Sequence, residues 1–251
     1  MGKSAQNMLI QISRFICVYL LFFLGVCVDV ILSSGFLAFA SHIGFLRAIE
    51  EAKVPVAGVC GTSSGALVGS LWASGLSTYE IEREIFQGRP FSHLSFHPYI
   101  WRGLFSLRKL VTLLQDIAVD RLEETSIPFG VGVCTSDWIP HIKESGPLAE
   151  FVVASCSIPY LFASVYIDGV RYCDGGAGDR IGAQGWKRLK NPQQSMIHLV
   201  ERSRGVNKEE GIDGSIVVRS PRSGASFFDF GDYQARIERS RCATHDALKK
   251  I

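Results

Sequence analysis

Residues 56–75 read VAGVCGTSSGALVGSLWASG, and this stretch decides the fold that we expect for the chain. Its first five residues form a short apolar run of the kind that makes a buried strand. GTSSG (61–65) is a tight turn, and ALVGSLWAS (66–74) is typical of a helix that ends at Gly75. The stretch therefore predicts a strand, a sharp turn and a helix in immediate succession.

Ser63 lies at the centre of this turn, in the pattern G-x-S-x-G. A serine between a buried strand and a helix can act as a nucleophile, because the sharp turn exposes its hydroxyl group and the helix N-terminus stabilises developing negative charge. Gly61 and Gly65 complete this nucleophile elbow, since they carry no Cβ atom that would clash. Ser64 opens the helix and is the weaker candidate. The competing interpretation is an ordinary turn of small residues.

Another strand and helix precede the turn. VDVILSS (28–34) is apolar and β-branched, and in SHIGFLRAIEEAK (41–53) apolar residues recur every three positions. The polar positions of that helix predict an exposed face made of Arg47, Glu50, Glu51 and Lys53. Alternating strands and helices imply parallel strands joined by right-handed crossovers. We therefore expect an α/β sheet that is covered by helices on both faces.

The rest of the chain extends this pattern. A hairpin is expected at 164–176, turning at Asp168 and Gly169. Further elements are expected as strands at 129–136, 196–200 and 215–220, a short helix within 147–157, and a surface helix near Tyr233–Leu248. The expected regions are an apolar N-terminal segment (1–27), the main α/β domain (28–220) and a polar, partly helical C-terminal tail (221–251).

The composition excludes several classes of protein. The 251 residues are 47% hydrophobic and 20% charged, which is the balance of an ordinary globular domain rather than of a disordered or coiled-coil chain. The 26 Lys and Arg residues against 24 Asp and Glu residues give a net charge of +2, so no strong field favours nucleic acid. Seven cysteines without a C-x-x-C pair predict neither a disulfide framework nor a structural zinc site.

The N-terminus carries an apolar stretch of nearly bilayer-spanning length. It reads LIQISRFICVYLLFFLGVCV (9–28) and is interrupted by Gln11, Ser13 and Arg14. One interpretation is a signal sequence or membrane anchor within residues 9–27, which would place the protein at a membrane. The other is an apolar extension that packs on the core of a cytoplasmic protein. The sequence leaves both open.

A serine at its normal pKa is a poor nucleophile and needs a base within hydrogen-bond reach. His198, in an expected strand, or His245, near the C-terminus, would complete a Ser-His-Asp triad. A carboxylate is the other option. Asp174 stands in C-D-G-G after an expected strand, where Gly175 and Gly176 allow close backbone approach. An ordinary Asp-Gly turn explains the same motif.

Three blocks of the sequence together resemble the signature of the patatin-like phospholipases. They are VDVILSSGFLAFASHIGFLRAIEE (28–51), VAGVCGTSSGALVGSLWASG (56–75) and VVASCSIPYLFASVYIDGVRYCDGG (152–176), in the order that the family has. The similarity covers roughly residues 28–200, and three blocks in one chain are far more specific than a single motif.

The resemblance implies a three-layer α/β/α sandwich with a mostly parallel central sheet. It also implies a serine lipid acyl hydrolase, which cleaves acyl esters of phospholipids or other glycerolipids through a Ser-Asp dyad. Ser63 would be the nucleophile and Asp174 the base, and Gly175 and Gly176 would complete the DGG motif. This chemistry needs no metal ion and no cofactor, and its partners would be a lipid substrate and a membrane surface.

The loop at 34–39 departs from the family's pattern. The resemblance implies an oxyanion hole formed by the backbone N–H groups of Gly35 and Phe36. Where the family has a glycine-rich loop ending in a basic residue and Gly, this chain reads SGFLAF, with one glycine and with Ala38 in the basic position. A positive φ at Phe36 would strain that residue. A competing hypothesis is therefore a catalytically impaired domain that binds lipid or a protein partner.

Overall fold

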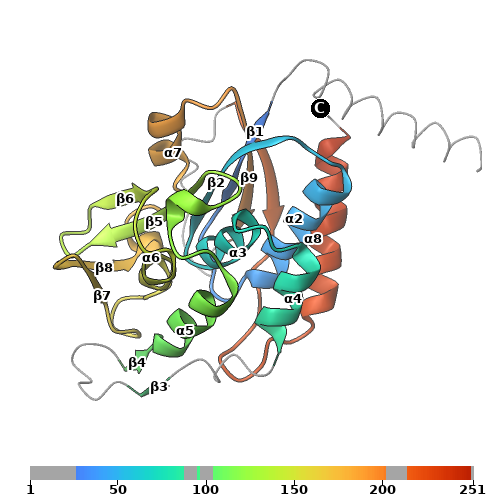
Figure 1. The fold of residues 1–251 in the computed structure, drawn as a ribbon. Coiled ribbons are helices and arrows are strands. Elements are labelled where there is room, and N and C mark those ends of the chain that lie inside the picture. The colour runs from blue at the N-terminus through green and yellow to red at the C-terminus, as the bar shows by residue number, and fades with distance from the viewer. Residues whose placement is uncertain (1–26, 88–94, 97–103, 202–213, 250–251) are drawn as a thin grey trace, which may run out of the picture.

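The computed structural model describes residues 27–87, 95–96, 104–201 and 214–249, and within them a central sheet of eight strands (Figure 1). The strand order is β10-β9-β1-β2-β5-β8-β7, and β6 pairs with β5 outside this path. The strands are β1 (Val28–Leu32), β2 (Val56–Thr62), β5 (Phe129–Thr135), β6 (Pro140–Lys143), β7 (Val165–Ile167), β8 (Val170–Asp174), β9 (Gln194–Val200) and β10 (Ile216–Ser220).

Five neighbouring strands, from β10 to β5, run parallel, whereas β6, β7 and β8 add antiparallel pairs at one side. The predicted α/β fold with a mostly parallel sheet is thereby confirmed. The expected hairpin is also present, because β7 and β8 pair across the turn at Asp168 and Gly169. Since the carboxyl ends of parallel strands meet at one edge, the segments after β1 and β2 lie close together.

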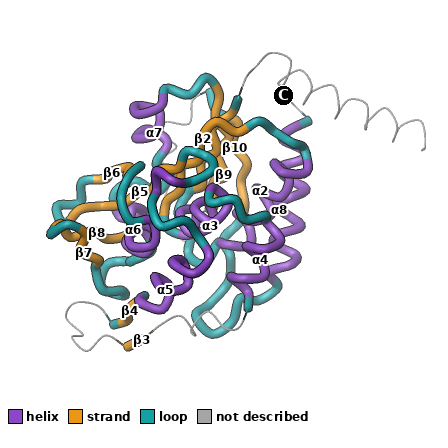
Figure 2. The backbone as a smooth tube through the Cα atoms, in the orientation of Figure 1, coloured by secondary structure: helices purple, strands orange, loops and turns teal. Residues whose placement is uncertain are grey.

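Helices cover both faces of the sheet (Figure 2). Val28, Val30 and Leu32 of β1 belong to the larger apolar core, which includes helices on one face. Ile31 belongs to a second core with Trp186 of α7 on the other face. The helices are α2 (Phe39–Glu51), α3 (Ser64–Ala73), α4 (Thr78–Phe86), α5 (Arg108–Ile117), α6 (Leu148–Ser155), α7 (Ala183–Lys190) and α8 (Tyr233–Leu248). Short elements are β3 (Ser95–Phe96), β4 (Phe105–Ser106), η3 (Leu122–Glu124) and η4 (Gly175–Ala177).

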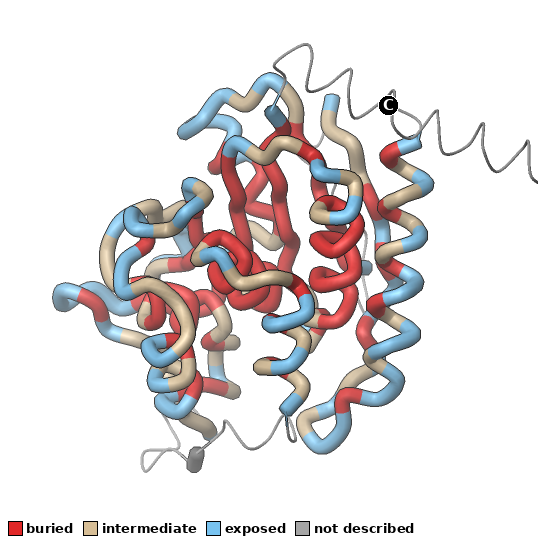
Figure 3. The backbone as a smooth tube through the Cα atoms, turned by 45° about the vertical axis from the view of Figure 1, so that its right-hand side comes forward, coloured by how far each residue is buried: buried red, intermediate tan, exposed pale blue. Residues whose placement is uncertain are grey.

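Helix α8 lies side by side with α2, and Figure 3 shows buried positions recurring along it. Its buried residues are spaced for one helical face and are Ile237, Ser240, Thr244 and Leu248. The two backbones touch at Gly44, where a Cβ atom would lie 2.1 Å from the Ile237 carbonyl oxygen. Residues beyond 220 therefore pack directly on the elements that precede them.

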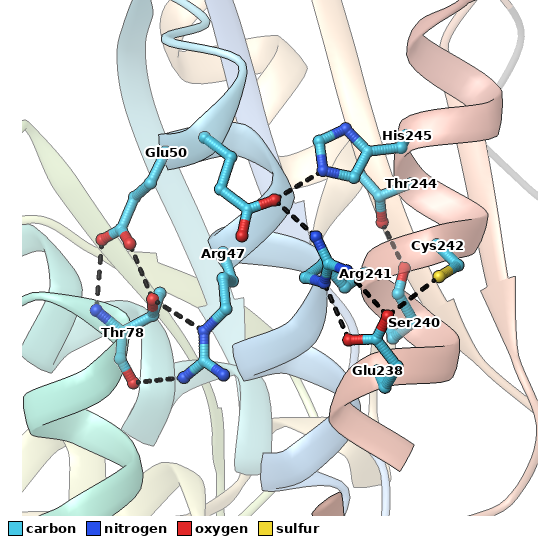
Figure 4. Close-up of polar contacts among 10 residues, drawn as sticks. Arg47, Glu50, Thr78, Glu238, Ser240, Arg241, Cys242, Thr244 and His245 are labelled. Atoms are coloured by element: carbon cyan, nitrogen blue, oxygen red, sulfur yellow. Dashed lines mark hydrogen bonds and ion pairs between the residues drawn. The ribbon is translucent and has the colours of Figure 1, made fainter. Parts of the chain in front are cut away.

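The exposed face predicted for the helix after β1 is wrong at Arg47, which is buried. Its guanidinium donates to the Thr78 hydroxyl (3.3 Å) and carbonyl (3.2 Å) and to Glu82 (2.7 Å). Glu50 accepts from the backbone N–H and the hydroxyl of Thr78 (Figure 4). Arg47 is buried because α4 packs on α2 and supplies partners for its charge, which periodicity within one helix does not reveal.

The apolar N-terminal stretch (9–28), with its candidate anchor at residues 9–27, lies outside the described residues except for Cys27 and Val28. Among the described helices, none combines the length and apolarity needed to cross a bilayer.

Candidate active site

Ser63 stands between β2 and α3, where the sequence predicted a nucleophile elbow. Its backbone has φ 55° and ψ −119°, a conformation that residues with a side chain rarely adopt. The flanking glycines make the turn sterically feasible. A Cβ atom on Gly65 would lie 2.3 Å from the Leu32 carbonyl oxygen, and one on Gly61 would lie 2.5 Å from the Gly65 carbonyl oxygen. Both positions therefore require glycine because backbone crowds them.

The structure brings Ser63 and Asp174 together. The Ser63 hydroxyl donates a 2.7 Å hydrogen bond to Oδ2 of Asp174, the last residue of β8. The other carboxylate oxygen, Oδ1, accepts the Gly176 N–H at 2.7 Å. A Cβ atom on Gly175 would lie 2.2 Å from the Gly132 carbonyl oxygen, so this glycine lets the DGG turn close onto β5. Asp174 thus has both oxygens engaged and one of them aimed at the serine.

Burial sets the electrostatics of this pair. Asp174 is 4% exposed, and desolvation raises the pKa of its carboxyl group from 3.8 to about 6. The hydrogen bonds from Ser63 and Gly176 oppose this shift because they stabilise the charged form. A carboxyl group with a pKa near 6 is still mostly ionised at pH 7, yet it binds a proton far more readily than an exposed aspartate.

Ser155 links the backbone of the nucleophile elbow to β5 through two hydrogen bonds, a role that the sequence did not reveal. Its Oγ accepts the Ser63 N–H at 2.8 Å and donates to the Gly132 carbonyl at 2.6 Å. Ser155 ends α6 and is completely buried. It belongs to the third block of the family resemblance (152–176), but its partners lie 92 and 23 residues away in the sequence.

The loop after β1 forms a turn beside Ser63. The Ala38 N–H donates to the Gly35 carbonyl at 3.3 Å, and the left-handed residue of this turn is Leu37, with φ 48°. The strain considered for Phe36 therefore falls on its neighbour. The Phe36 carbonyl accepts a 2.6 Å hydrogen bond from the Ser223 hydroxyl, which comes from the segment before α8. Gly35 is confined as well, since a Cβ atom there would lie 2.8 Å from Ala38 Cβ.

A large apolar pocket opens over Ser63. It has an empty volume of about 910 Å³, part of it continuous with solvent, and the loop residues Gly35, Phe36 and Leu37 form part of its wall. Helix α5 lines it through one face, and the segment before α8 also contributes. Its apolar lining side chains include Leu67, Leu71, Ile85, Leu107, Leu110, Leu114, Ile158, Phe162, Phe227 and Phe230. Ser63 thus faces a cavity suited to a long apolar group.

Neither candidate histidine partners Ser63. His198 is buried against His42, with a 2.8 Å separation of the two Nδ1 atoms, and its Nε2 lies 2.9 Å from the Ser220 hydroxyl. His245 lies on α8, where its Nε2 is 2.6 Å from Glu51. The Ser63 hydroxyl donates its hydrogen bond to Asp174 instead. This geometry gives no support to a Ser-His-Asp triad.

The fold and the paired side chains define an α/β sandwich with a serine elbow and an adjacent buried carboxylate. The family profile of the patatin-like phospholipases matches residues 30–185. The chain belongs to this family, since the match covers more than half of it.

Similar proteins are longer than this chain. An uncharacterized NTE family protein of Mycobacterium tuberculosis is 29% identical over 156 residues, which cover 59% of this chain and 42% of that protein. Lysophospholipase NTE1 of Saccharomyces cerevisiae is 28% identical over 174 residues, which cover 62% of this chain and 10% of that protein. The chain thus spans less than half the length of these relatives.

Among solved structures, VipD from Legionella pneumophila is similar in fold. The TM-score is 0.56 with 12% identity, and the match covers 89% of this chain and 67% of that one. At this identity the likeness concerns the fold alone.

Proposed function

We propose that the chain is a serine lipid acyl hydrolase that cleaves acyl ester bonds of phospholipids or other glycerolipids through Ser63 and Asp174. The observation that carries the proposal is the 2.7 Å hydrogen bond from the Ser63 hydroxyl to the buried Asp174 carboxylate, at the edge of a large apolar pocket. Family membership and the name of the yeast relative, a lysophospholipase, support the same class of substrate.

In the proposed reaction, Ser63 Oγ attacks the ester carbonyl carbon while its proton passes to Asp174. The resulting intermediate collapses, the ester C–O bond breaks, and Asp174 returns the proton to the departing alcohol. Water then attacks the acyl-serine and gives a proton to Asp174. When this second intermediate collapses, the bond between the acyl carbon and Ser63 Oγ breaks, Oγ takes the proton back from Asp174, and the fatty acid leaves. A carboxyl pKa of about 6 suits both proton transfers, because it lies close to neutral pH.

The negative charge on the carbonyl oxygen needs donors, and the backbone N–H groups of Gly35 and Phe36 are our candidates. Both residues border the pocket with Ser63. Within the described part of the chain, no protein group accepts either N–H. Donors left free beside a nucleophile are what an oxyanion hole requires. The departure of this loop from the family's pattern therefore need not abolish the hole.

The substrate is proposed to carry a long acyl chain and to be taken from a lipid surface. The pocket wall is dominated by Leu, Ile and Phe side chains. Contact between these side chains and an acyl chain removes apolar surface from water, which is favourable. Exposed aromatic side chains lie on segments that also line the pocket: Tyr160 is 87% exposed and Phe228 is 75% exposed. Such residues favour contact with a membrane interface.

A binding module without turnover is the second candidate. The observation that favours it is Leu37, which holds φ 48° where glycine would be unstrained. A turn kept in this conformation by a bulky residue can displace the neighbouring N–H groups from their donor positions. This hypothesis predicts that lipid binds in the pocket beside Ser63 and that Ser63 does not react with it.

Covalent labelling separates the two candidates. A fluorophosphonate probe should label the wild-type chain and leave Ser63→Ala unlabelled, and the same substitution should abolish hydrolysis of lysophosphatidylcholine. Ser64→Ala is the matched control, because Ser64 lies beside Ser63 and its hydroxyl contacts His42 instead of Asp174. Labelling of Ser63→Ala, or a wild-type chain that neither labels nor hydrolyses acyl esters, would overturn the proposed dyad.

A further inference from the structure

Arg180 forms hydrogen bonds with both backbone polar groups of Ser34, the first residue of the loop at 34–39. The Ser34 N–H donates to the Arg180 carbonyl at 2.7 Å, and Arg180 Nη2 donates back to the Ser34 carbonyl at 3.1 Å. The same nitrogen also donates to the Val200 carbonyl at the end of β9, at 2.7 Å. One guanidinium thus joins the loop after β1 to the neighbouring strand, although Arg180 and Ser34 are 146 residues apart.

The backbone that carries Arg180 is itself fixed. Asp179 accepts the Ile181 N–H at 3.0 Å and the Gly182 N–H at 2.9 Å, which closes the chain between η4 and α7. Arg180 follows the DGG motif by four residues, so the same connection holds the base Asp174 at one end and the guanidinium at the other. The segment from Asp174 to Arg180 therefore connects the candidate base with the loop at 34–39.

Because the peptide bond is planar, the hydrogen bonds between Arg180 and Ser34 also fix the direction of the Gly35 N–H. The Ser34 carbonyl and the Gly35 N–H belong to one trans peptide unit and point in opposite directions. A hydrogen bond that fixes the carbonyl fixes the N–H as well. Binding of the carbonyl by a cation also polarises the unit and strengthens the N–H as a donor. Since Gly35 borders the pocket beside Ser63, this N–H is one that an oxyanion would need.

We infer that Arg180 is a positioning residue that holds the Ser34–Gly35 peptide so that its N–H serves as an oxyanion donor. The inference rests on the proposed hydrolysis at Ser63. Arg180 does not touch the substrate in this account; it acts through the peptide. Its effect should therefore be confined to the transition state, where negative charge develops on the carbonyl oxygen.

The test compares three substitutions of Arg180 in the full chain with a matched control. Arg180→Met keeps the aliphatic stem and removes the donors, Arg180→Lys keeps one charged donor group, and Arg180→Ala leaves space for a free guanidinium ion. Arg188→Met is the control, because Arg188 is exposed on α7 and its Nε donates to the Gln184 carbonyl within that helix. Each protein is titrated to completion with a fluorophosphonate, and kcat is expressed per labelled serine on p-nitrophenyl butyrate.

Arg180→Met should lower kcat per labelled serine at least about tenfold while KM changes by less than about threefold. Arg180→Lys should be intermediate, millimolar guanidinium should restore part of the activity of Arg180→Ala, and Arg188→Met should match the wild type. A merely structural role would reduce the fraction of labelled protein, leave kcat per site unchanged and show no rescue.

The possible results separate failure of the inference about Arg180 from failure of the proposed hydrolase function. An active wild type with unchanged kcat per site in Arg180→Met overturns the role of Arg180 and leaves the dyad intact. A wild type without labelling or turnover overturns both. If Arg180→Met and Arg180→Ala lose their folded circular dichroism, Arg180→Lys carries the test. Loss of folding in that variant too would mean that Arg180 stabilises the fold instead of positioning the loop.

Discussion

Asp174 is the residue at which proposed function and stability conflict. Its carboxyl pKa is raised by burial from 3.8 to about 6. The folded state therefore binds the proton more tightly than the unfolded state, and the stability from this protonated group is fully present below about pH 4. That contribution is lost as the pH rises through about 6. The shift corresponds to roughly 3 kcal/mol.

Asp174→Asn should therefore be inactive yet more stable than the wild type at pH 8, by about 3 kcal/mol at most. The amide resembles the protonated carboxyl group, so the two proteins should become equally stable near pH 4. Urea unfolding at both pH values measures the difference, and wild-type kcat/KM should rise with pH through about 6. Asp168→Asn, in the exposed hairpin turn, is the control. Equal stability at pH 8 would contradict the burial argument.

At the scale of elements, the contact between α2 and α8 positions one wall of the pocket. The segment before α8 supplies Phe227 and Phe230 to that wall, and Ser223 to the Phe36 carbonyl. Around this contact, Arg241 and His245 of α8 both reach Glu51 of α2 (Figure 4). These partly exposed polar contacts contribute little each, so close approach of the helices carries the packing.

Gly44→Ala should separate the helices and destabilise the fold by about 1–3 kcal/mol, although alanine is the better helix former. The reason is the 2.1 Å approach of the added Cβ atom to the Ile237 carbonyl oxygen, which cannot move without α8. Gly69→Ala in α3 is the matched control. Its Cβ atom would meet only ends of side chains, at 3.2 Å, and should cost less. Chemical denaturation compares the two, and an equal or smaller loss for Gly44→Ala would contradict this packing.

At the scale of the whole molecule, two exposed aromatic residues stand next to pocket-lining residues in the chain, and the pocket is lined largely by members of the larger apolar core. Tyr160 lies between the pocket residues Ile158 and Phe162, and Phe228 follows Phe227. Helix α7 covers the other face of the sheet. A lipid surface that contacts Tyr160 and Phe228 would therefore lie next to the pocket, and an acyl chain would enter without crossing much water.

The double variant Tyr160→Ser, Phe228→Ser should bind phosphatidylcholine vesicles on the order of tenfold more weakly, because two aromatic side chains no longer enter the interface. Hydrolysis of vesicle lipid should fall in parallel, while turnover of soluble p-nitrophenyl butyrate stays the same. Leu189→Ser removes an exposed apolar residue from α7 and should alter neither measurement. Vesicle co-sedimentation measures binding. An unchanged double variant would place the lipid contact elsewhere.

The sequence by itself determined what neighbouring residues encode. Alternation of apolar runs and helical periodicity predicted the strands and helices, and α8 was expected at Tyr233–Leu248, where the structure has it. The elbow around Ser63 and the hairpin at Asp168 were predictable because glycine and turn residues act over a few positions. The residues alone offered Asp174 as one candidate base beside His198 and His245, and the family resemblance singled it out, since 111 residues separate it from Ser63.

Only the tertiary structure decided which distant groups meet. The bonds from Ser155 to the elbow, from Arg180 to Ser34 and from Ser223 to Phe36 span 92, 146 and 187 residues. Arg47 became buried for the same reason, because its partners come from another helix. Local patterns set which segments become helix or strand, but a buried polar group is satisfied by whatever packing brings to it, and packing depends on the whole chain at once.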